Sequence, residues 1–163
     1  MADMHKVICM NREFGCCGSQ IASEAAKRLG IDYYDSNLKK IAIEYGGIEP
    51  DVLEHLDEQA PNLAFYKRVS IGNEKALKDT TYHDVLFALQ SEVLKNFAKE
   101  KDFIVVGRCA TYVLRDEPVK MLRIKLTGSK EFKIKQVMKE EGLNALAASK
   151  LIRKKEGKRK DNY

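Results

Sequence analysis

The apolar residues of the chain fall into short runs that alternate with stripes at helical spacing. Short runs rich in β-forming residues occupy four segments: 6–10, 31–35, 102–110 and 119–129. Runs of this length and composition are typical of buried strands. Between the first two runs, small and apolar residues recur at helical spacing: Ile21, Ala22, Ala25, Ala26 and Leu29. The pattern predicts a helix from Ser19 to Leu29, with Gly30 as its C-terminal stop.

Further helical patterns occupy the middle and the end of the chain. Residues 36–81 are helical in pieces: Ser36 is the N-cap of the first piece, which stops at the glycine pair 46–47, Pro50 suits the first turn of the next piece, and Pro61 marks another break. A longer helix follows, and its apolar stripe consists of Val85, Leu86, Leu89, Val93, Leu94 and Phe97. The final stretch, 143–163, predicts a helix followed by a basic tail.

Strands separated by helices predict βαβ units and therefore a parallel sheet with helices on both faces. This is the doubly wound α/β class, in which ligands gather at the carboxyl ends of the strands. The chain has 163 residues, of which 44% are hydrophobic, enough to bury one sizeable core. We therefore expect a single domain over residues 1–163.

The net charge of +5 conceals an asymmetry along the chain. Residues 120–160 hold 14 Lys/Arg against 4 Asp/Glu, whereas the rest of the chain is acidic. The basic C-terminal third is where an anion would bind. Two anions are candidates, a nucleotide polyphosphate and a nucleic acid, and a solvated lysine-rich helix face is the alternative. Nucleic acid is the weaker candidate because aromatic residues are not interleaved with the basic ones.

Several classes of protein are excluded by what the sequence lacks. No apolar run approaches the roughly 18 residues of a membrane span, and the N-terminus does not resemble a signal peptide, so a cytoplasmic protein is expected. The cysteines show no CxxC spacing, which predicts reduced thiols rather than a disulfide framework or a metal site. They are Cys9, Cys16, Cys17 and Cys109. The histidines, His5, His55 and His83, are likewise scattered.

Three predicted strands end in residues that suit an anion site. The first is followed by "NREFGCCGS", the second ends at Asp35, and the third continues into "GRCATY", which contains Arg108. A strand, a glycine-containing turn and a helix N-terminus together offer backbone N–H groups and a positive dipole end to a phosphate. If the strands share one sheet, all three segments lie along one edge of it.

The turn matches the phosphate-loop pattern GxxxxGK[ST] poorly. Arg12 stands at the first glycine, Cys17 at the second and Gly18 at the lysine, so that only Ser19 agrees. Taken alone, the turn is therefore open to two interpretations, a phosphate loop or an ordinary strand-to-helix turn. Asp35 is similarly either a ligand-binding carboxylate or an acid at a helix N-terminus, and Arg12 is either a phosphate ligand or part of an ion pair.

Longer segments resemble the cytidylate kinase-like family of P-loop nucleoside monophosphate kinases. "REFGCCGSQIA" is similar to the family's "REYGSGGREIA", and the likeness continues in "LGIDYYDSNLKKIA", "LDEQAPN", "LQSEVLKNFAKEKDFIVVGRCATYVLRD" and "KEGKRKDNY". The most specific piece is "IVVGRCA". The resemblance implies a P-loop three-layer α/β/α fold and transfer of the ATP γ-phosphoryl group, with Mg²⁺, to CMP or a related nucleotide.

The resemblance also implies roles for particular residues. The phosphate turn would consist of Gly15, Cys16, Cys17, Gly18, Ser19 and Gln20, with Ser19 as the Mg²⁺ ligand. Asp35 and Arg108 would bind the acceptor, with residues 36–81 as a helical acceptor-binding insert. The family's lid pattern places an arginine at Arg159, with Arg153 close by, which makes about 144–163 a basic lid. Family members usually continue into a further strand and helix beyond this point.

Departures from the family pattern leave two functions open. Cys16, Cys17 and Ser19 stand where the family usually has Ser, Gly and Arg, and Glu156 and Asn162 replace an Asp and a Tyr in the lid. Because an arginine binds phosphate oxygens bidentately, Arg12, Arg153 or Arg159 could replace the missing lysine. The chain is then either a working nucleotide kinase or a nucleotide- or phosphate-binding protein whose catalysis is weak or lost.

Overall fold

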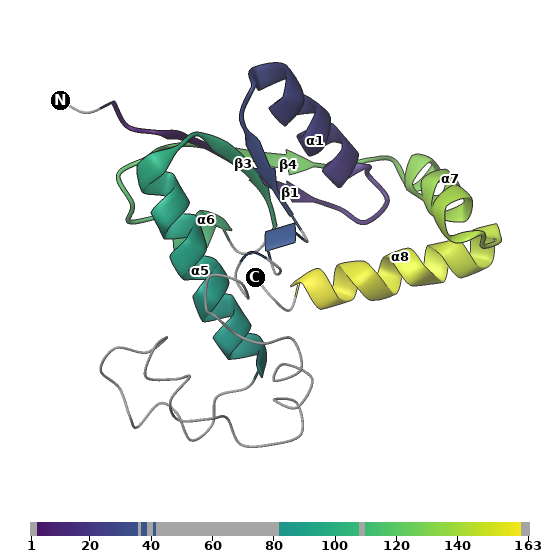
Figure 1. Ribbon diagram of the computed structural model, residues 1–163. Helices are drawn as coiled ribbons and strands as arrows, with labels where there is room; N and C mark the ends of the chain where they lie inside the picture. The colour runs from purple at the N-terminus through teal and green to yellow at the C-terminus, as the bar shows by residue number, and fades with distance from the viewer. Residues whose placement is uncertain (1–2, 36, 39–40, 42–81, 108–109, 161–163) are drawn as a thin grey trace.

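The computed structural model describes residues 3–35, 37–38, 41, 82–107 and 110–160 (Figure 1). The predicted acceptor-binding insert, 36–81, lies almost wholly outside these residues. The described elements, in chain order, are β1 (Lys6–Arg12), α1 (Gly18–Leu29), β2 (Asp32–Tyr34), α5 (Tyr82–Glu100), β3 (Phe103–Val106), α6 (Ala110–Val113), β4 (Lys120–Leu126), α7 (Lys130–Glu141) and α8 (Ala145–Lys160).

The four strands form one parallel sheet in the order β2-β3-β1-β4. Val7 of β1 lies opposite Phe103 of β3 on one side and Met121 of β4 on the other. The chain leaves β1 through α1 toward β2, whereas it leaves β3 through α6 toward β4 on the opposite side. The order therefore changes direction between β1 and β3, where the carboxyl ends of a doubly wound sheet open to ligands.

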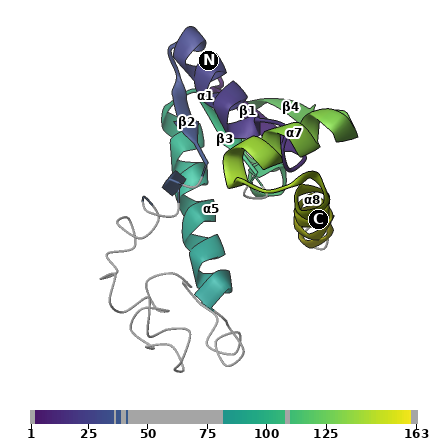
Figure 2. The same ribbon diagram turned by 90° about the vertical axis from the view of Figure 1, so that its right-hand side faces the viewer.

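Helices cover both faces of this sheet, as Figures 1 and 2 show. On one face, Ala22 and Ala26 of α1 pack against Met10, Ile104 and Val106. On the other face, α5 and α6 cover the strands, and the cluster contains Val7, Cys9, Leu89, Val93, Leu94, Phe103, Val105, Ala110 and Val113. The predicted three-layer α/β/α fold is confirmed.

The sequence patterns of the strands follow from their places in the sheet. All four residues of β3 are fully buried, since β3 lies between two strands and beneath two helical layers, and its sequence is accordingly apolar throughout. β4 lies at the edge of the described sheet, and its polar residues alternate with apolar ones, of which Leu122 is 55% exposed. α1 ends where predicted, because Gly30 adopts the left-handed conformation (φ 66°) and its N–H bonds back to Lys27.

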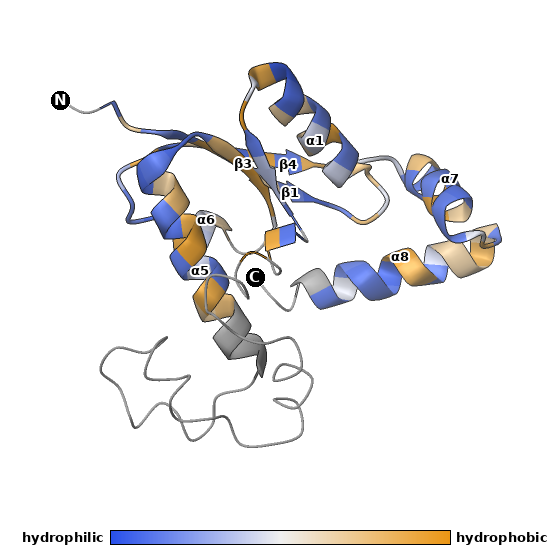
Figure 3. Ribbon diagram, in the orientation of Figure 1, coloured by the Kyte–Doolittle hydropathy of each residue, from blue (hydrophilic) through white to orange (hydrophobic). Residues whose placement is uncertain are grey.

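Two features of the C-terminal region differ from the prediction. α7 was not predicted, although Ser129 caps its first turn by accepting a hydrogen bond from the Phe132 N–H, and Gly142 ends it at φ 64°. Helix α8 runs through the basic stretch to Lys160, whereas a tail was predicted there. Lysine and arginine are good helix formers, and the second half of α8 is a hydrophilic helix (Figure 3). In the described residues, no helix is long and apolar enough to span a membrane.

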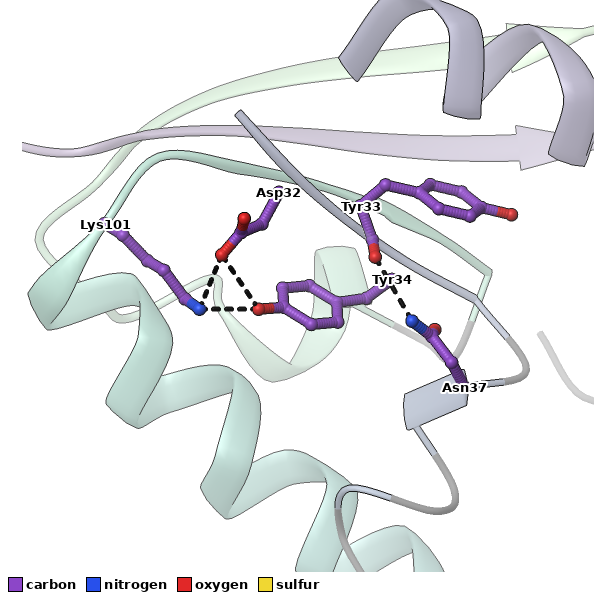
Figure 4. Close-up of polar contacts among 5 residues, drawn as sticks. All are labelled: Asp32, Tyr33, Tyr34, Asn37 and Lys101. Carbon is purple, nitrogen blue, oxygen red and sulfur yellow. Dashed lines mark hydrogen bonds and ion pairs between the residues drawn. The ribbon is translucent and has the colours of Figure 1, made fainter. Parts of the chain in front are cut away.

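Lys101 joins the end of α5 to β2 at the amino end of the sheet (Figure 4). Its Nζ donates to Asp32 Oδ2 (2.7 Å) and to the Tyr34 hydroxyl (2.6 Å), and it lies 4.1 Å from the centroid of the Phe97 ring. The hydrogen bond from Lys101 lowers the pKa of Asp32. Although burial opposes the charge of Lys101, its hydrogen bonds to Asp32 and Tyr34 leave its pKa raised. This contact is remote from the carboxyl ends of the strands and is structural.

Substituting Lys101→Met is expected to lower the free energy of unfolding by about 1 kcal/mol, because methionine keeps the aliphatic packing but loses the ion pair and the contact with the ring. The contribution of Asp32 is lost as pH falls below about 4, and that of Lys101 is lost as pH rises above about 10. Urea unfolding should therefore show a steady difference from wild type between these limits and a smaller one at pH 3. An equal loss in Lys99→Met, an exposed lysine in the last turn of α5, would contradict this.

Candidate phosphate-binding site

Residues 13–17 form a tight turn between the end of β1 and the start of α1. Gly15 has φ 87°, and Cys17 adopts the left-handed conformation with φ 58° and ψ 33°. Cys17 is the N-cap of α1, and no side chain caps the helix there. A left-handed conformation is costly for a residue with a Cβ, so the turn holds Cys17 under strain.

The N-terminal end of α1 has backbone N–H groups that lie at the carboxyl edge of the sheet. The first hydrogen bond of the helix runs from the Ile21 N–H to the Cys17 carbonyl (3.0 Å), so the N–H groups of Gly18, Ser19 and Gln20 lie outside the helical ladder. The first turn of α1 contains no acidic residue. Uncapped N–H groups and a positive helix end are the features that bind phosphate.

Arg12 lies across the N-terminal end of α1, between the ends of β1 and β3. A Cβ on Gly18 would lie 2.6 Å from Arg12 Cγ, and a Cβ on Gly107 would lie 2.7 Å from Arg12 Nη1. Because neither Gly18 nor Gly107 has a Cβ, the Arg12 side chain fits between them. Its guanidinium is 3.8 Å from Asp35 Oδ1, and the side chain is only 22% exposed. Arg12 thus forms its ion pair with Asp35 at the crevice between β1 and β3.

Asp35 brings the end of β2 to the same place. Its carboxylate is buried and accepts hydrogen bonds from the Ser19 hydroxyl and from the Tyr33 hydroxyl (3.1 Å). Because Ser19 donates its proton to Asp35, the lone pairs of its oxygen remain for a further partner. Two residues predicted in the turn segment, Arg12 and Ser19, therefore both contact Asp35, which was predicted in a separate segment.

Tyr33 of β2 packs against the cluster beneath α1. Its hydroxyl nevertheless reaches the site and donates to Asp35. Burial raises the pKa of Tyr33, which keeps the hydroxyl a donor. The alternation of side chains along β2 places Tyr33 on the α1 face, and this was the only indication in the sequence that Tyr33 lies near the turn.

Lys133 is a second residue that the sequence did not indicate. It comes from α7, and its Nζ lies 3.0 Å from Glu13 Oε2 and 2.9 Å from Glu156 Oε1. Its hydrogen bond lowers the pKa of Glu13, and burial raises the pKa of the neighbouring Cys16 thiol. An ammonium therefore does contact the turn, but it is paired with two carboxylates.

Other predicted site residues are not joined to this cluster. Arg153 is exposed on α8, and Gln20 extends toward α7, where its amide lies 3.5 Å from Glu140 Oε1. Arg108 and the side chain of Arg159 lie outside the described residues. Cys9, Cys16 and Cys17 are free thiols. The residues described contain no group of three or more His, Cys, Asp or Glu arranged to hold a metal ion.

An open cavity of about 760 Å³ lies on the opposite face of the sheet, beside α6 and β4. Its described lining includes Cys9, Thr111, Arg123 and Lys125 but no residue of the turn. Burial raises the pKa of the Cys9 thiol to about 11, so the thiol is neutral. The cavity has cations of its own, including Arg115, but none of its described lining residues belongs to the turn, so it is a separate pocket.

Substituting Cys17→Gly is expected to raise the free energy of unfolding by about 1 kcal/mol, since glycine adopts the left-handed conformation without a Cβ penalty. Urea unfolding measures this gain. Cys17→Ala is the matched control, because it removes the thiol and keeps the strain. Equal stabilities of the glycine and alanine variants would contradict the strain at Cys17.

The fold and the site define a doubly wound α/β protein in which a helix start without a side-chain cap lies at the switch point of the sheet. Residues 7–163 match the model of the cytidylate kinase-like family, and the chain belongs to that family. Membership supports a kinase-like, nucleotide-binding role. A crystal structure of an uncharacterized protein from Eubacterium ventriosum ATCC 27560 is similar, with 26% identity and a TM-score of 0.61 over 97% of this chain and 75% of that chain. No curated protein matches the chain.

Proposed function

We propose that the protein is a nucleoside monophosphate kinase that transfers the γ-phosphoryl group of ATP to CMP or a related nucleotide. The observation that carries the proposal is the contact of Arg12, Ser19 and Asp35 at the uncapped start of α1. Arg12 ends β1, Ser19 lies in the first turn of α1 and Asp35 follows β2, so they meet at the point of the sheet where ligands of this fold class bind. Membership of the cytidylate kinase-like family supports the same function.

The turn suits the phosphates of ATP and a bound Mg²⁺. The N–H groups of residues 18–20 would bind phosphate oxygens, and the Ser19 oxygen would coordinate the metal while its proton stays on the hydrogen bond to Asp35. Mg²⁺ would neutralise charge on the transferring group. Phosphoryl transfer needs little covalent chemistry from the protein, so the main requirements are positioning and charge neutralisation.

In this proposal, Arg12 contacts the phosphates in place of the lysine that the turn lacks. Its guanidinium lies at the crevice, its stem is fixed against Gly18, and its planar fork can bind two phosphate oxygens at once. Lys133 is a poorer candidate, since its ammonium is engaged by Glu13 and Glu156. In this proposal Arg153 and Arg159 act from the basic lid on the transferring group, and Asp35 and Arg108 position the acceptor.

A second function is favoured by one specific observation, the strained Cys17. A residue bulkier than glycine in the left-handed conformation restricts the backbone conformations that the turn can adopt. The lysine that a phosphate loop normally carries is also missing. The alternative is therefore a nucleotide- or phosphate-binding protein of the same fold in which catalysis is weak or lost.

A coupled assay of ADP release separates the two functions. The full chain is supplied with Mg-ATP and, in turn, CMP, UMP, dCMP and dUMP, while calorimetry measures Mg-ATP binding under the same conditions. Monophosphate-dependent turnover is expected, with CMP or a close relative as the best acceptor. Binding of Mg-ATP without turnover for any acceptor would favour the binding protein, and the absence of both would overturn the two functions together.

A further inference from the structure

The α7–α8 hairpin is joined to the rest of the molecule at the phosphate turn. Val137, Ala148 and Ile152 form the buried centre of the hairpin, and Phe14 of the turn packs against them. A Cβ on Gly15 would lie 3.1 Å from both the Lys133 carbonyl and Val137 Cγ2. The turn and α7 are therefore in close contact, and Figure 1 shows α7 beside the sheet and α8 running back below it in this view.

Lys133 links three elements at this junction. Its side chain is 12% exposed, and its ammonium is shared between Glu13 of the turn and Glu156 of α8, which it reaches at 3.0 and 2.9 Å. The positions of the two carboxylates depend on the ammonium between them, because without it their negative charges would repel each other. The methylenes of Lys133 also pack beside Gly15 and Gly128. Lys133 thus connects the turn to α8 through α7.

We propose that Lys133 is a positioning residue that couples occupation of the phosphate turn to the placement of α8. The inference rests on the proposed binding of a nucleotide polyphosphate at the turn. An anion on the N–H groups of α1 stabilises one conformation of residues 13–17, and Glu13 transmits that preference to Lys133 and Glu156. Because the coupling is reciprocal, a fixed α8 in turn favours the turn conformation that binds the anion.

The coupling gives the basic face of α8 a defined position relative to the site. Glu156 and Arg153 are three residues apart on the same helix and therefore lie on neighbouring parts of its surface. Holding Glu156 restricts where Arg153 can reach. Lys133 would act on phosphoryl transfer only through this restriction, without touching the nucleotide.

Hydrogen exchange measured on the ligand-free full chain tests the junction directly. Lys133→Met is expected to accelerate amide exchange about tenfold both in residues 13–17 and in α8. Lys133→Arg should restore most of the protection, since it keeps the charge. The matched control is Lys135→Met, an exposed lysine on the same helix, which should exchange like wild type. If Lys133→Met does not fold, Glu156→Gln replaces it and is expected to loosen both segments in the same way.

Repeating the exchange with Mg-ADP tests the coupling itself. In wild type, Mg-ADP should slow exchange in the turn and in α8 together, whereas in Lys133→Met the protection should stay in the turn. Equal exchange in Lys133→Met and Lys135→Met, acceleration confined to α8, or unchanged protection of α8 by Mg-ADP in Lys133→Met would each overturn the inference. If Mg-ADP protects neither segment in wild type, the proposed nucleotide binding fails, and the ligand-free comparison alone decides the role of Lys133.

Discussion

Substituting Arg12→Met is expected to weaken binding of Mg-ATP about 100-fold. The guanidinium is the described cation that lies directly across the uncapped start of α1, and a bidentate charge-assisted contact to phosphate accounts for a loss of this size. Methionine is close in length to the arginine stem, so it keeps the packing against Gly18. It also leaves the negative charge of Asp35 unpaired, which opposes an incoming polyphosphate.

Two controls separate the charge of Arg12 from its shape. Arg12→Lys keeps the charge without the planar fork and should fall between wild type and methionine. Arg28→Met removes an arginine that is 78% exposed and pairs with Glu24 on the outer surface of α1, so it should bind Mg-ATP like wild type. Calorimetric affinities that are equal for Arg12→Met and Arg28→Met would show that Arg12 does not hold the phosphates.

Substituting Gly18→Ala is expected to lower the free energy of unfolding by about 2 kcal/mol, which is a typical cost of overpacking. The new Cβ would lie 2.6 Å from Arg12 Cγ and 2.8 Å from Arg12 Cβ. These atoms belong to the base of the arginine side chain, so the clash is relieved only by moving the strand or the helix. The displaced guanidinium should also weaken Mg-ATP binding.

Gly157→Ala is the matched comparison, since it makes the same substitution in a helix. A Cβ on Gly157 would meet no atom within 4 Å among the described residues, so alanine should stabilise α8 by up to about 1 kcal/mol through its higher helix propensity. Urea unfolding of both variants should give changes of opposite sign. Stabilisation by Gly18→Ala would mean that Arg12 does not lie over Gly18 in solution.

Elements with a strong local pattern could be predicted from the sequence. The strand at Phe103–Val106 is apolar throughout because it is buried on both faces, and α1 combines a periodic apolar stripe with Gly30 at its end. The parallel sheet followed from the alternation of such elements. The outer helix α7 was missed because its apolar positions are sparse, although Ser129 and Gly142 mark its two ends.

The candidate site was predictable only in part, because its contacts join distant segments. The turn, Ser19 and Asp35 follow predicted strands, and the rule that ligands bind at the carboxyl ends brought them together. No local pattern indicates that Lys133 reaches Glu13, since 120 positions separate them. The left-handed conformation of Cys17 also depends on the whole turn. The sequence showed only a resemblance to a family pattern that has glycine at this position.

The most direct test of phosphate binding at the turn is a titration of ¹⁵N-labelled protein with Mg-ADP, followed by amide chemical shifts. The largest shifts are expected at Gly15–Gln20, whose N–H groups would meet the phosphates, with smaller ones at Asp35. The result that would contradict binding at the turn is saturable binding with the largest shifts elsewhere, such as at Thr111, Arg123 and Lys125 beside the cavity on the opposite face. No shift at any amide at millimolar Mg-ADP would contradict it equally.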